Sequence, residues 1–174
     1  MIGISGKMGT GKDLCYQLIR EEYPEAVNIK FAGPLKQIVA ILASVDESVV
    51  HSREGKALQV DHLKSRTIRQ LQQDIGEQFR SMYGPNVWVS LALKEAQKQK
   101  LSVITDVRYE NEADAIHDAG GIVIRLTRNG IHQDGHVSET ALDHYTRFDA
   151  HIDNTNLTRA QLKEQLMNIV KSHI

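Results

Sequence analysis

The stretch Met1-Ile2-Gly3-Ile4-Ser5-Gly6-Lys7-Met8-Gly9-Thr10-Gly11-Lys12-Asp13 decides the fold. It joins a short apolar run to a glycine frame (Gly, four residues, Gly, Lys) and then to the start of a helix, which is the context that a phosphate-binding loop requires. Its glycines let backbone N–H groups turn toward a polyphosphate, and the helix beginning near Gly11 adds the positive end of its dipole. Lys12 is placed to reach the outer phosphates. A turn that binds nothing is the alternative, which the agreement of spacing, lysine and position disfavours.

Asp13 departs from the usual form of this motif, in which a Ser or Thr hydroxyl after the lysine holds Mg2+. A carboxylate in that place is either a defect or a sign of a particular subfamily. The loop residues predicted to contact a nucleotide are Gly6, Lys7, Gly9, Thr10, Gly11, Lys12 and Asp13.

Composition sets the limits of what the chain can be. Its 174 residues suit one domain, residues 1–174, with 41% hydrophobic and 25% charged residues as in ordinary globular proteins. A net charge of -1 disfavours a nucleic-acid polymer as partner. The single cysteine, Cys15, excludes an intramolecular disulfide and fits a reducing compartment. With no apolar run of membrane-spanning length and no signal-peptide pattern, we expect a cytoplasmic protein without a membrane partner.

Short apolar runs alternate with helical patterns along the chain. Strands are predicted at Ile2–Ser5, Ala26–Phe31, Leu101–Thr105, Gly121–Leu126 and Ala150–Asp153. Helices are predicted at Lys12–Glu22, Pro34–Ala43, Asn86–Gln99 and Glu110–Ala119, with a last helix capped by Thr158. The alternation predicts an α/β fold, a doubly wound five-stranded parallel sheet flanked by helices, with ligands at the carboxyl ends of the strands.

A further helix carries the best apolar pattern in the chain. Its stripe consists of Ile68, Leu71, Ile75, Phe79 and Met82, which recur at helical period and are core by default. Beside the stripe, Arg69, Gln73 and Arg80 lie on nearby faces, and Trp88 follows. Arginine and glutamine suit a phosphate and a base edge, and tryptophan offers a flat face for stacking. Solvated helix residues and a core tryptophan are the alternative.

Three other segments carry residues that could meet phosphates or their Mg2+. Asp106 ends an apolar strand, where a phosphate-loop fold keeps a carboxylate that steers Mg2+, and Arg108 follows two residues later. A turn cap and a surface ion pair are the alternative for these two. Lys36 opens the helix after Phe31-Ala32-Gly33-Pro34, although a lone lysine is more often a surface residue. Arg128 begins a polar loop, approximately 127–139, at the place of a closing lid. His132 and His136 in that loop lack a convincing metal-ligand set.

Taken in order, these pieces resemble the bacteriophage-type deoxynucleoside monophosphate kinases and, more distantly, phosphomevalonate kinase. The matching stretches are Ser5-Gly6 with Gly11-Lys12-Asp13, Phe31-Ala32-Gly33-Pro34-Leu35-Lys36, Thr105-Asp106-Val107-Arg108-Tyr109 with Asn111-Glu112-Ala113, and His136-Val137-Ser138-Glu139. They cover nearly the whole chain, and the Gly-Lys-Asp ending is itself typical of the group. The chain is shorter than several relatives between Ala43 and Asp61.

The resemblance implies transfer of the γ-phosphoryl group of ATP to a deoxynucleoside 5′-monophosphate. Lys12 and Mg2+ would hold the transferring group, and Asp13 and Asp106 would orient the metal. The acceptor-binding part, approximately 34–90, would use Lys36, Arg69, Gln73, Arg80 and Trp88, together with Arg108 and Glu139. Arg128 would close from the lid, and Asn154 falls where related kinases lodge adenine.

Two other functions stay open from the sequence: a kinase for another phosphorylated small molecule, and a nucleotide-binding switch that hydrolyses ATP slowly. A second group of cations well away from Lys12 disfavours the switch. The preferred base is undetermined, as is the assembly, for which a homodimer is one option. If the chain is phage-encoded, its compartment is the host cytoplasm.

Overall fold

A computed structural model describes residues 1–130 and 140–173 of the chain. The described residues form two compact units. The first contains Met1–Lys30 and Leu93–Ile174, and the second contains Phe31–Ala92. The second unit is thus an insertion in the first and spans nearly the same residues as the predicted acceptor-binding part.

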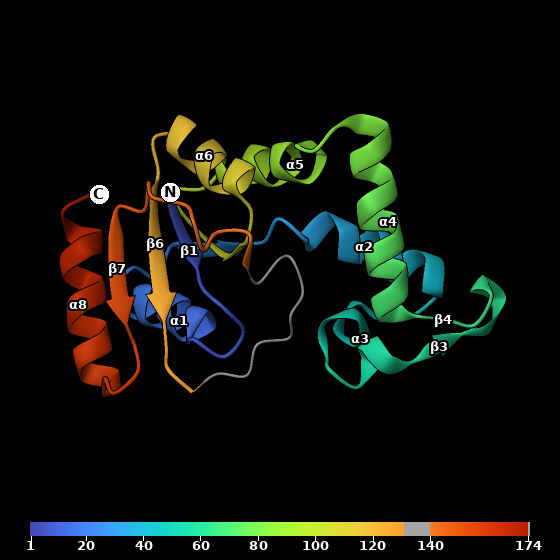
Figure 1. Cartoon of the computed structure of the whole chain (residues 1–174), viewed down its shortest axis with the longest axis horizontal. Coiled ribbons are helices and arrows are strands. Elements are labelled where there is room, and N and C mark those ends of the chain that lie inside the picture. The colour runs from blue at the N-terminus through green and yellow to red at the C-terminus, as the bar shows by residue number, and fades with distance from the viewer. Residues whose placement is uncertain (131–139, 174) are drawn as a thin grey trace. The chain divides into compact units, whose positions relative to one another are not determined.

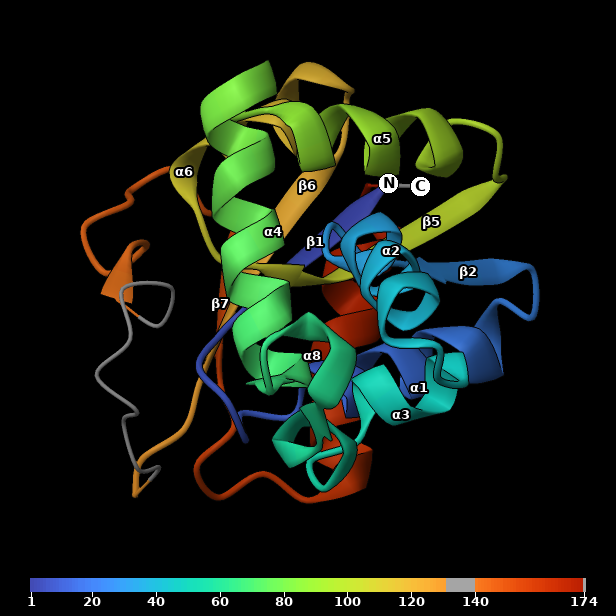
Figure 2. The same cartoon turned by 90° about the vertical axis from the view of Figure 1, so that its right-hand side faces the viewer.

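The first unit is built on a parallel five-stranded sheet in the order β2-β5-β1-β6-β7; Figure 1 labels β1, β6 and β7, and Figure 2 labels all of its strands. Its strands are β1 (Ile2–Ser5), β2 (Ala26–Ile29), β5 (Leu101–Val107), β6 (Ile122–Thr127) and β7 (Ala150–Asp153). The central strand β1 is buried at every position, as expected for a parallel strand covered on both faces. The phosphate-loop motif follows β1 directly, so the sheet places it at the carboxyl edge where ligands of such folds bind.

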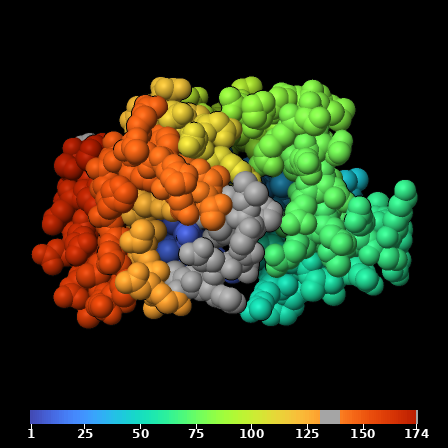
Figure 3. All heavy atoms as spheres, viewed as in Figure 1, coloured from blue at the N-terminus to red at the C-terminus, as the bar shows by residue number. Residues whose placement is uncertain are grey.

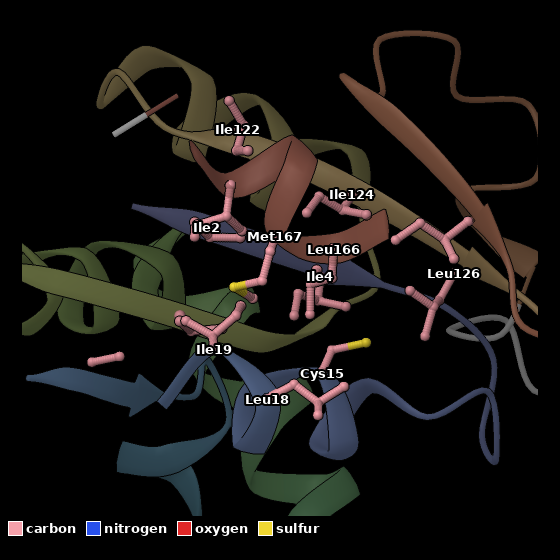
Figure 4. Packing of buried hydrophobic residues seen from close by; sticks show 14 of the residues in the cluster. Ile2, Ile4, Cys15, Leu18, Ile19, Ile122, Ile124, Leu126, Leu166 and Met167 are labelled. Carbon is pink, nitrogen blue, oxygen red and sulfur yellow. The ribbon is translucent and has the colours of Figure 1, made fainter. Parts of the chain in front are cut away.

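Helices cover the two faces of this sheet. On one face, α1 (Lys12–Glu22) and α8 (Arg159–Lys171) bury an apolar cluster against β1 and β6. In Figure 4, Cys15 and Leu18 of α1 and Leu166 and Met167 of α8 lie among the strand isoleucines of this cluster. On the other face, Ile116 of α6 (Glu110–Asp118) comes so close to Gly3 that a Cβ there would lie 2.6 Å from its Cδ1. Glycine in the middle of β1 therefore permits the close approach of α6.

The second unit is mainly helical. It contains α2 (Gly33–Ala43), α3 (Glu47–His51), two short 3-10 turns, the two-residue strands β3 (Gln59–Val60) and β4 (Arg66–Thr67), and α4 (Ile68–Tyr83). The helix α5 (Val87–Ala96) starts in this unit and ends in the first. Helix α2 packs against α4 (Figure 2), and their apolar residues enclose Trp88. The unit thus has a hydrophobic core of its own.

The structure confirms the predicted α/β sheet and most element positions. Strands β1 and β7 and helix α1 have the predicted bounds, and the other predicted elements differ by one to three residues at their ends. Thr158 caps α8 as expected, because its hydroxyl accepts a hydrogen bond from the Gln161 backbone N–H. Met82 is a correction: it continues the helical stripe of α4, but its side chain is 66% exposed. The stripe ends there because Met82 lies in the last turn, beyond the apolar cluster of this unit.

Residues 43–61, where the resemblance predicts that the chain is shorter than several relatives, fold into α3, a 3-10 turn and β3. None of the helices within residues 1–130 and 140–173 combines the length and apolar character that a membrane crossing requires.

Candidate active site

The glycine motif forms a loop that leads from β1 into α1. Gly11 is the N-cap of α1 and has a backbone φ of 106°, in the left-handed region that favours glycine. The chain can therefore turn sharply here and point the start of α1 into the loop. Because the first N–H groups of a helix have no partner within the helix, the loop and α1 together make an anion-binding site.

Lys12 is held by its own loop. Its Nζ donates to the backbone carbonyls of Gly6, at 2.5 Å, and Lys7, at 2.8 Å. Thr10 also closes the loop, since its hydroxyl donates to the Lys7 carbonyl at 2.9 Å. The ammonium group and the carbonyls of Gly6 and Lys7 are thus paired with each other, and these bonds fix Lys12 within the loop.

Asp13 lies in the first turn of α1 with its side chain 77% exposed. Its carboxylate lies 3.3 Å from the ammonium of Lys30, which follows β2, and accepts a 3.4 Å hydrogen bond from the hydroxyl of Thr105 in β5. The hydroxyl that the motif lacks after Lys12 is therefore supplied beside Asp13 by another strand. Sequence reasoning missed Lys30 and Thr105, because only the strand order β2-β5-β1 brings them next to the loop.

Strand β5 has an irregular register at the predicted metal-steering residue. Gly3 of β1 pairs with Ile104, but Ser5, two residues later, pairs with Val107, three residues later. One extra residue is therefore accommodated in β5 at Thr105-Asp106, which is the pattern of a β-bulge. Such bulges redirect side chains, and this one adjoins the phosphate loop. Asp106 itself is half-buried near the carboxyl end of β5.

Arg108 follows β5 on a backbone held by a buried carboxylate. Glu112 is 5% exposed, and its Oε2 accepts hydrogen bonds from the backbone N–H groups of Arg108 at 2.7 Å and Tyr109 at 3.1 Å. Glu112 belongs to the Asp-Val-Arg-Tyr-x-Asn-Glu-Ala segment, whose spacing could have indicated this role. The turn that carries Arg108 is thus fixed by α6.

Two further predicted residues contact the loop from the other side. The guanidinium of Arg128 lies 3.5 Å from the Gly9 carbonyl oxygen. Asn154 follows β7, is 8% exposed, and donates from Nδ2 to the Thr10 carbonyl at 2.9 Å. The structure therefore brings Lys12, Asp13, Arg128 and Asn154 together around one loop.

Arg125 of β6 is a buried cation that the sequence analysis did not identify. It is 9% exposed, donates to the Ser5 hydroxyl at 2.9 Å, and pairs with the Asp143 carboxylate at 2.8 Å. The other Asp143 oxygen lies 3.4 Å from the Lys7 ammonium. Arg125 thus links the sheet to the phosphate loop through Asp143, since a buried guanidinium requires a paired carboxylate.

A cavity of about 490 Å3 opens beside this ion-pair network, and its lining includes Lys7, Arg125, Asp143, Tyr145 and Phe148. The Arg125 guanidinium lies 5.4 Å from the centre of the Phe148 ring, within the range of a cation–π contact. Residues 140–148, orange in Figure 3, belong to the molecular surface on the face shown there. The cavity therefore combines cations with aromatic walls next to the loop.

In the second unit, one helix carries most of the predicted acceptor residues. Arg69, Gln73 and Arg80 are spaced by four and seven residues, which places them along one side of α4. Arg69 and Gln73 are exposed, and Arg80 is half-buried. Lys36 of α2 is half-buried, with its Nζ 3.4 Å from Nδ1 of His51.

Trp88 has a different position from the one predicted. Its side chain is 2% exposed, its indole N–H donates to the Gly76 carbonyl at 3.2 Å, and its ring stacks on Phe79 with centroids 5.3 Å apart. The expectation of a free ring face for a base is therefore corrected: Trp88 is a core residue of the second unit. Its apolar surface and single N–H donor are both satisfied there.

Some predictions fall outside the described residues. Glu139, His132, His136 and most of the predicted lid belong to residues 131–139, which the structure does not describe. Within residues 1–130 and 140–173, no group of three or more His, Cys, Asp or Glu side chains could hold a metal ion. A Mg2+ ion bound to nucleotide phosphates does not need such a group, because it uses one or two carboxylates and keeps several waters.

A sheet of order β2-β5-β1-β6-β7 with a glycine loop and lysine after β1 defines a P-loop kinase, a class of phosphotransferases that take a phosphoryl group from a nucleotide. The solved structure of a shikimate kinase from Aquifex aeolicus vf5 is similar in fold, with a TM-score of 0.51 at 10% identity over 98% of this chain and 96% of that one.

Family comparison is more specific. Residues 44–165 match the family model described as "Deoxynucleotide monophosphate kinase". A relative from Acanthamoeba polyphaga mimivirus, described as "Putative deoxynucleotide monophosphate kinase", is 29% identical over 188 residues, covering 98% of this chain and 95% of the relative. The chain belongs to the deoxynucleotide monophosphate kinase family, and its function is the phosphorylation of deoxynucleoside monophosphates.

Proposed function

We propose that the donor is ATP, bound through Mg2+, and that the product is a deoxynucleoside diphosphate. The observation that supports this most strongly is the geometry of the loop, in which Lys12 and the start of α1 converge on one anion site. A monophosphate acceptor is already anionic near neutral pH, so the reaction does not require a strong general base. The main obstacle is the approach of two anions, which cations and positioning overcome.

Asp13 and Asp106 are the residues that would hold the metal shell. The carboxylate of Asp13 and the adjacent Thr105 hydroxyl are oxygen donors, which Mg2+ prefers, and the Asp13 side chain is exposed at the mouth of the loop. When bound, the ion would neutralise charge on the phosphates of the donor. Lys30 also offsets the charge of Asp13, since the two groups lie 3.3 Å apart.

Residues for the acceptor are proposed in each unit separately. In the first unit, Arg108 would bind the phosphate of the acceptor, and Glu112 fixes the backbone of Arg108. In the second unit, the residues proposed to bind the acceptor are Lys36, Arg69, Gln73 and Arg80, with Gln73 near its base. Arg128, which contacts the loop through Gly9, would stabilise charge that develops during transfer.

Measuring ADP formation with and without acceptor tests this proposal. We expect ADP to form when ATP, Mg2+ and a deoxynucleoside monophosphate are all present, and we expect EDTA to abolish it. ADP formation that is independent of any acceptor would instead identify a nucleotide-hydrolysing switch. Activity that survives EDTA would contradict the role of Mg2+.

A further inference from the structure

Asn154 is fixed in place from two directions. Its backbone N–H donates to the carbonyl of Thr127 at 2.8 Å, which ties the end of β7 to the end of β6. Its side chain is buried, at 8% exposed, and Nδ2 donates to the Thr10 carbonyl at 2.9 Å. The amide group therefore holds the phosphate loop from a rigid support.

The bond to Thr10 determines the direction of the next N–H group. In a trans peptide the C=O and the following N–H point to opposite sides. Because Asn154 holds the Thr10 carbonyl on its own side, the Gly11 N–H is directed to the side away from Asn154. The same bond keeps a carbonyl dipole from turning toward an anion in the loop, as Lys12 does for the carbonyls of Gly6 and Lys7.

Contact between Asn154 and Gly11 is close. A Cβ built on Gly11 would lie 2.8 Å from Asn154 Nδ2, so the amide occupies the space that a side chain would need. Glycine at this position therefore permits both the left-handed φ and the close approach of Asn154. A loop that is packed against its support in this way loses little conformational entropy when it binds an anion.

We propose that Asn154 is a positioning residue for the phosphate loop: it holds the Thr10 carbonyl so that the Gly11 N–H faces the donor phosphates. In this proposal Asn154 does not contact the base of the donor. The second part rests on the proposed function, in which the donor is a nucleoside triphosphate. This role differs from adenine binding, because the Nδ2 group of the buried amide bonds the loop in place of a base edge.

Binding of three ligands to two Asn154 variants separates the two roles. Inorganic tripolyphosphate, ATP and GTP share a phosphate chain but differ in their base, and calorimetry gives a Kd for each. We expect Asn154→Leu to raise all three Kd values by a common factor of about ten, because a buried carbonyl is left without its donor. Asn156→Ala is the matched control, since Asn156 is exposed two residues away, and it should leave all three unchanged.

Asn154→Asp keeps the shape of the side chain and removes the donor. At neutral pH its carboxylate faces the Thr10 carbonyl and should weaken binding at least as much as leucine does. Protonation of the introduced carboxyl below about pH 4 restores a donor, so tripolyphosphate binding should recover relative to wild type at the same pH. The leucine variant should show no such recovery, and a folding defect would not be reversed by acid.

The proposal is overturned if the variants lose affinity for ATP but not for tripolyphosphate, or if they lose affinity for none of the three ligands. It is also overturned if the affinities of Asn154→Asp and Asn154→Leu change with pH in the same way, or if wild-type protein does not bind tripolyphosphate. If wild-type protein forms no ADP from ATP while both variants still lose tripolyphosphate affinity, ATP as donor is refuted and the positioning role stands.

Discussion

The ammonium of Lys12 bonds the carbonyls of Gly6 and Lys7 in its own loop, so the loop itself fixes its position. We expect Lys12→Ala to lower kcat/KM for phosphoryl transfer about 100-fold or more, because a preorganised charge opposite the phosphates is lost. Steady-state assays measure this, with Lys98→Ala, an exposed surface variant, as control. Near-normal transfer by the Lys12 variant would refute its assigned role.

Arg108 should act on the acceptor side of the reaction. We predict that Arg108→Ala raises KM for the deoxynucleoside monophosphate about tenfold or more, since a charge-assisted hydrogen bond to phosphate is removed. The Kd of ATP should change little. A loss of ATP affinity at unchanged acceptor KM would count against the assignment.

Cys15 gives a prediction about reactivity. The side chain is fully buried in α1, and burial raises the pKa of its thiol to about 12, although the charge of Lys12 works to lower it. At pH 8 the thiol is therefore protonated, and only the thiolate is a nucleophile. Native protein should resist iodoacetamide at pH 8, and urea-unfolded protein should incorporate one equivalent, which mass spectrometry measures. Rapid labelling of the native protein would contradict this.

Asp149, which directly precedes β7, connects that strand to β6 and α6 through hydrogen bonds of its carboxylate. Its Oδ2 accepts hydrogen bonds from the Val123 backbone N–H at 2.7 Å and from Nε2 of His117 at 2.9 Å. Burial works to raise the pKa of Asp149, but these hydrogen bonds and the charge of His117 outweigh it, so the pKa is lowered. The carboxylate thus joins three neighbouring elements.

A lowered pKa in the folded state means that this stabilisation is present above the unfolded pKa of about 3.9 and is lost as pH falls through the folded pKa. We predict that Asp149→Asn lowers the free energy of unfolding at pH 7 by about 1 kcal/mol and reduces its loss between pH 7 and pH 3. Urea titrations at both values measure this, with the exposed Asp118→Asn as control. Equal losses in variant and wild type would show that Asp149 does not contribute.

Local chemistry made the elements of the first unit predictable from the sequence. Strand β1, its glycine loop and α1 follow from apolar runs, from Gly11 and from the period of the helix, so their bounds were predicted correctly. The two-residue strands β3 and β4 carry too few residues for a pattern to be visible. The exposure of Met82 depends on where the packing partners of α4 end, and helical periodicity alone does not predict that position.

The site was predictable where residues are close in sequence and not where they meet through the sheet. Lys12 and Asp13 belong to the loop motif, and Glu112 lies four residues from Arg108. By contrast, Thr105 and Lys30 reach Asp13 only because β5 lies between β1 and β2. The pairing of Arg125 with Asp143 links residues from β6 and from a later segment, and the burial of Trp88 depends on the packing of α2 against α4. Such contacts require the tertiary structure.

The described residues form a unit that contains the phosphate loop, Met1–Lys30 with Leu93–Ile174, and an inserted unit, Phe31–Ala92, which carries most of the proposed acceptor residues. The chain as a whole belongs to the deoxynucleotide monophosphate kinase family, whose model matches residues in both units. One domain over residues 1–174 stays a prediction, and the number of unfolding transitions in calorimetry tests it.

The most direct test of the proposed reaction is a coupled assay of ADP release with the four deoxynucleoside monophosphates and, for comparison, phosphomevalonate. With ATP and Mg2+, we predict turnover with at least one deoxynucleoside monophosphate, formation of the matching diphosphate, and loss of that activity in Lys12→Ala. Turnover with phosphomevalonate and none with any deoxynucleoside monophosphate would contradict it.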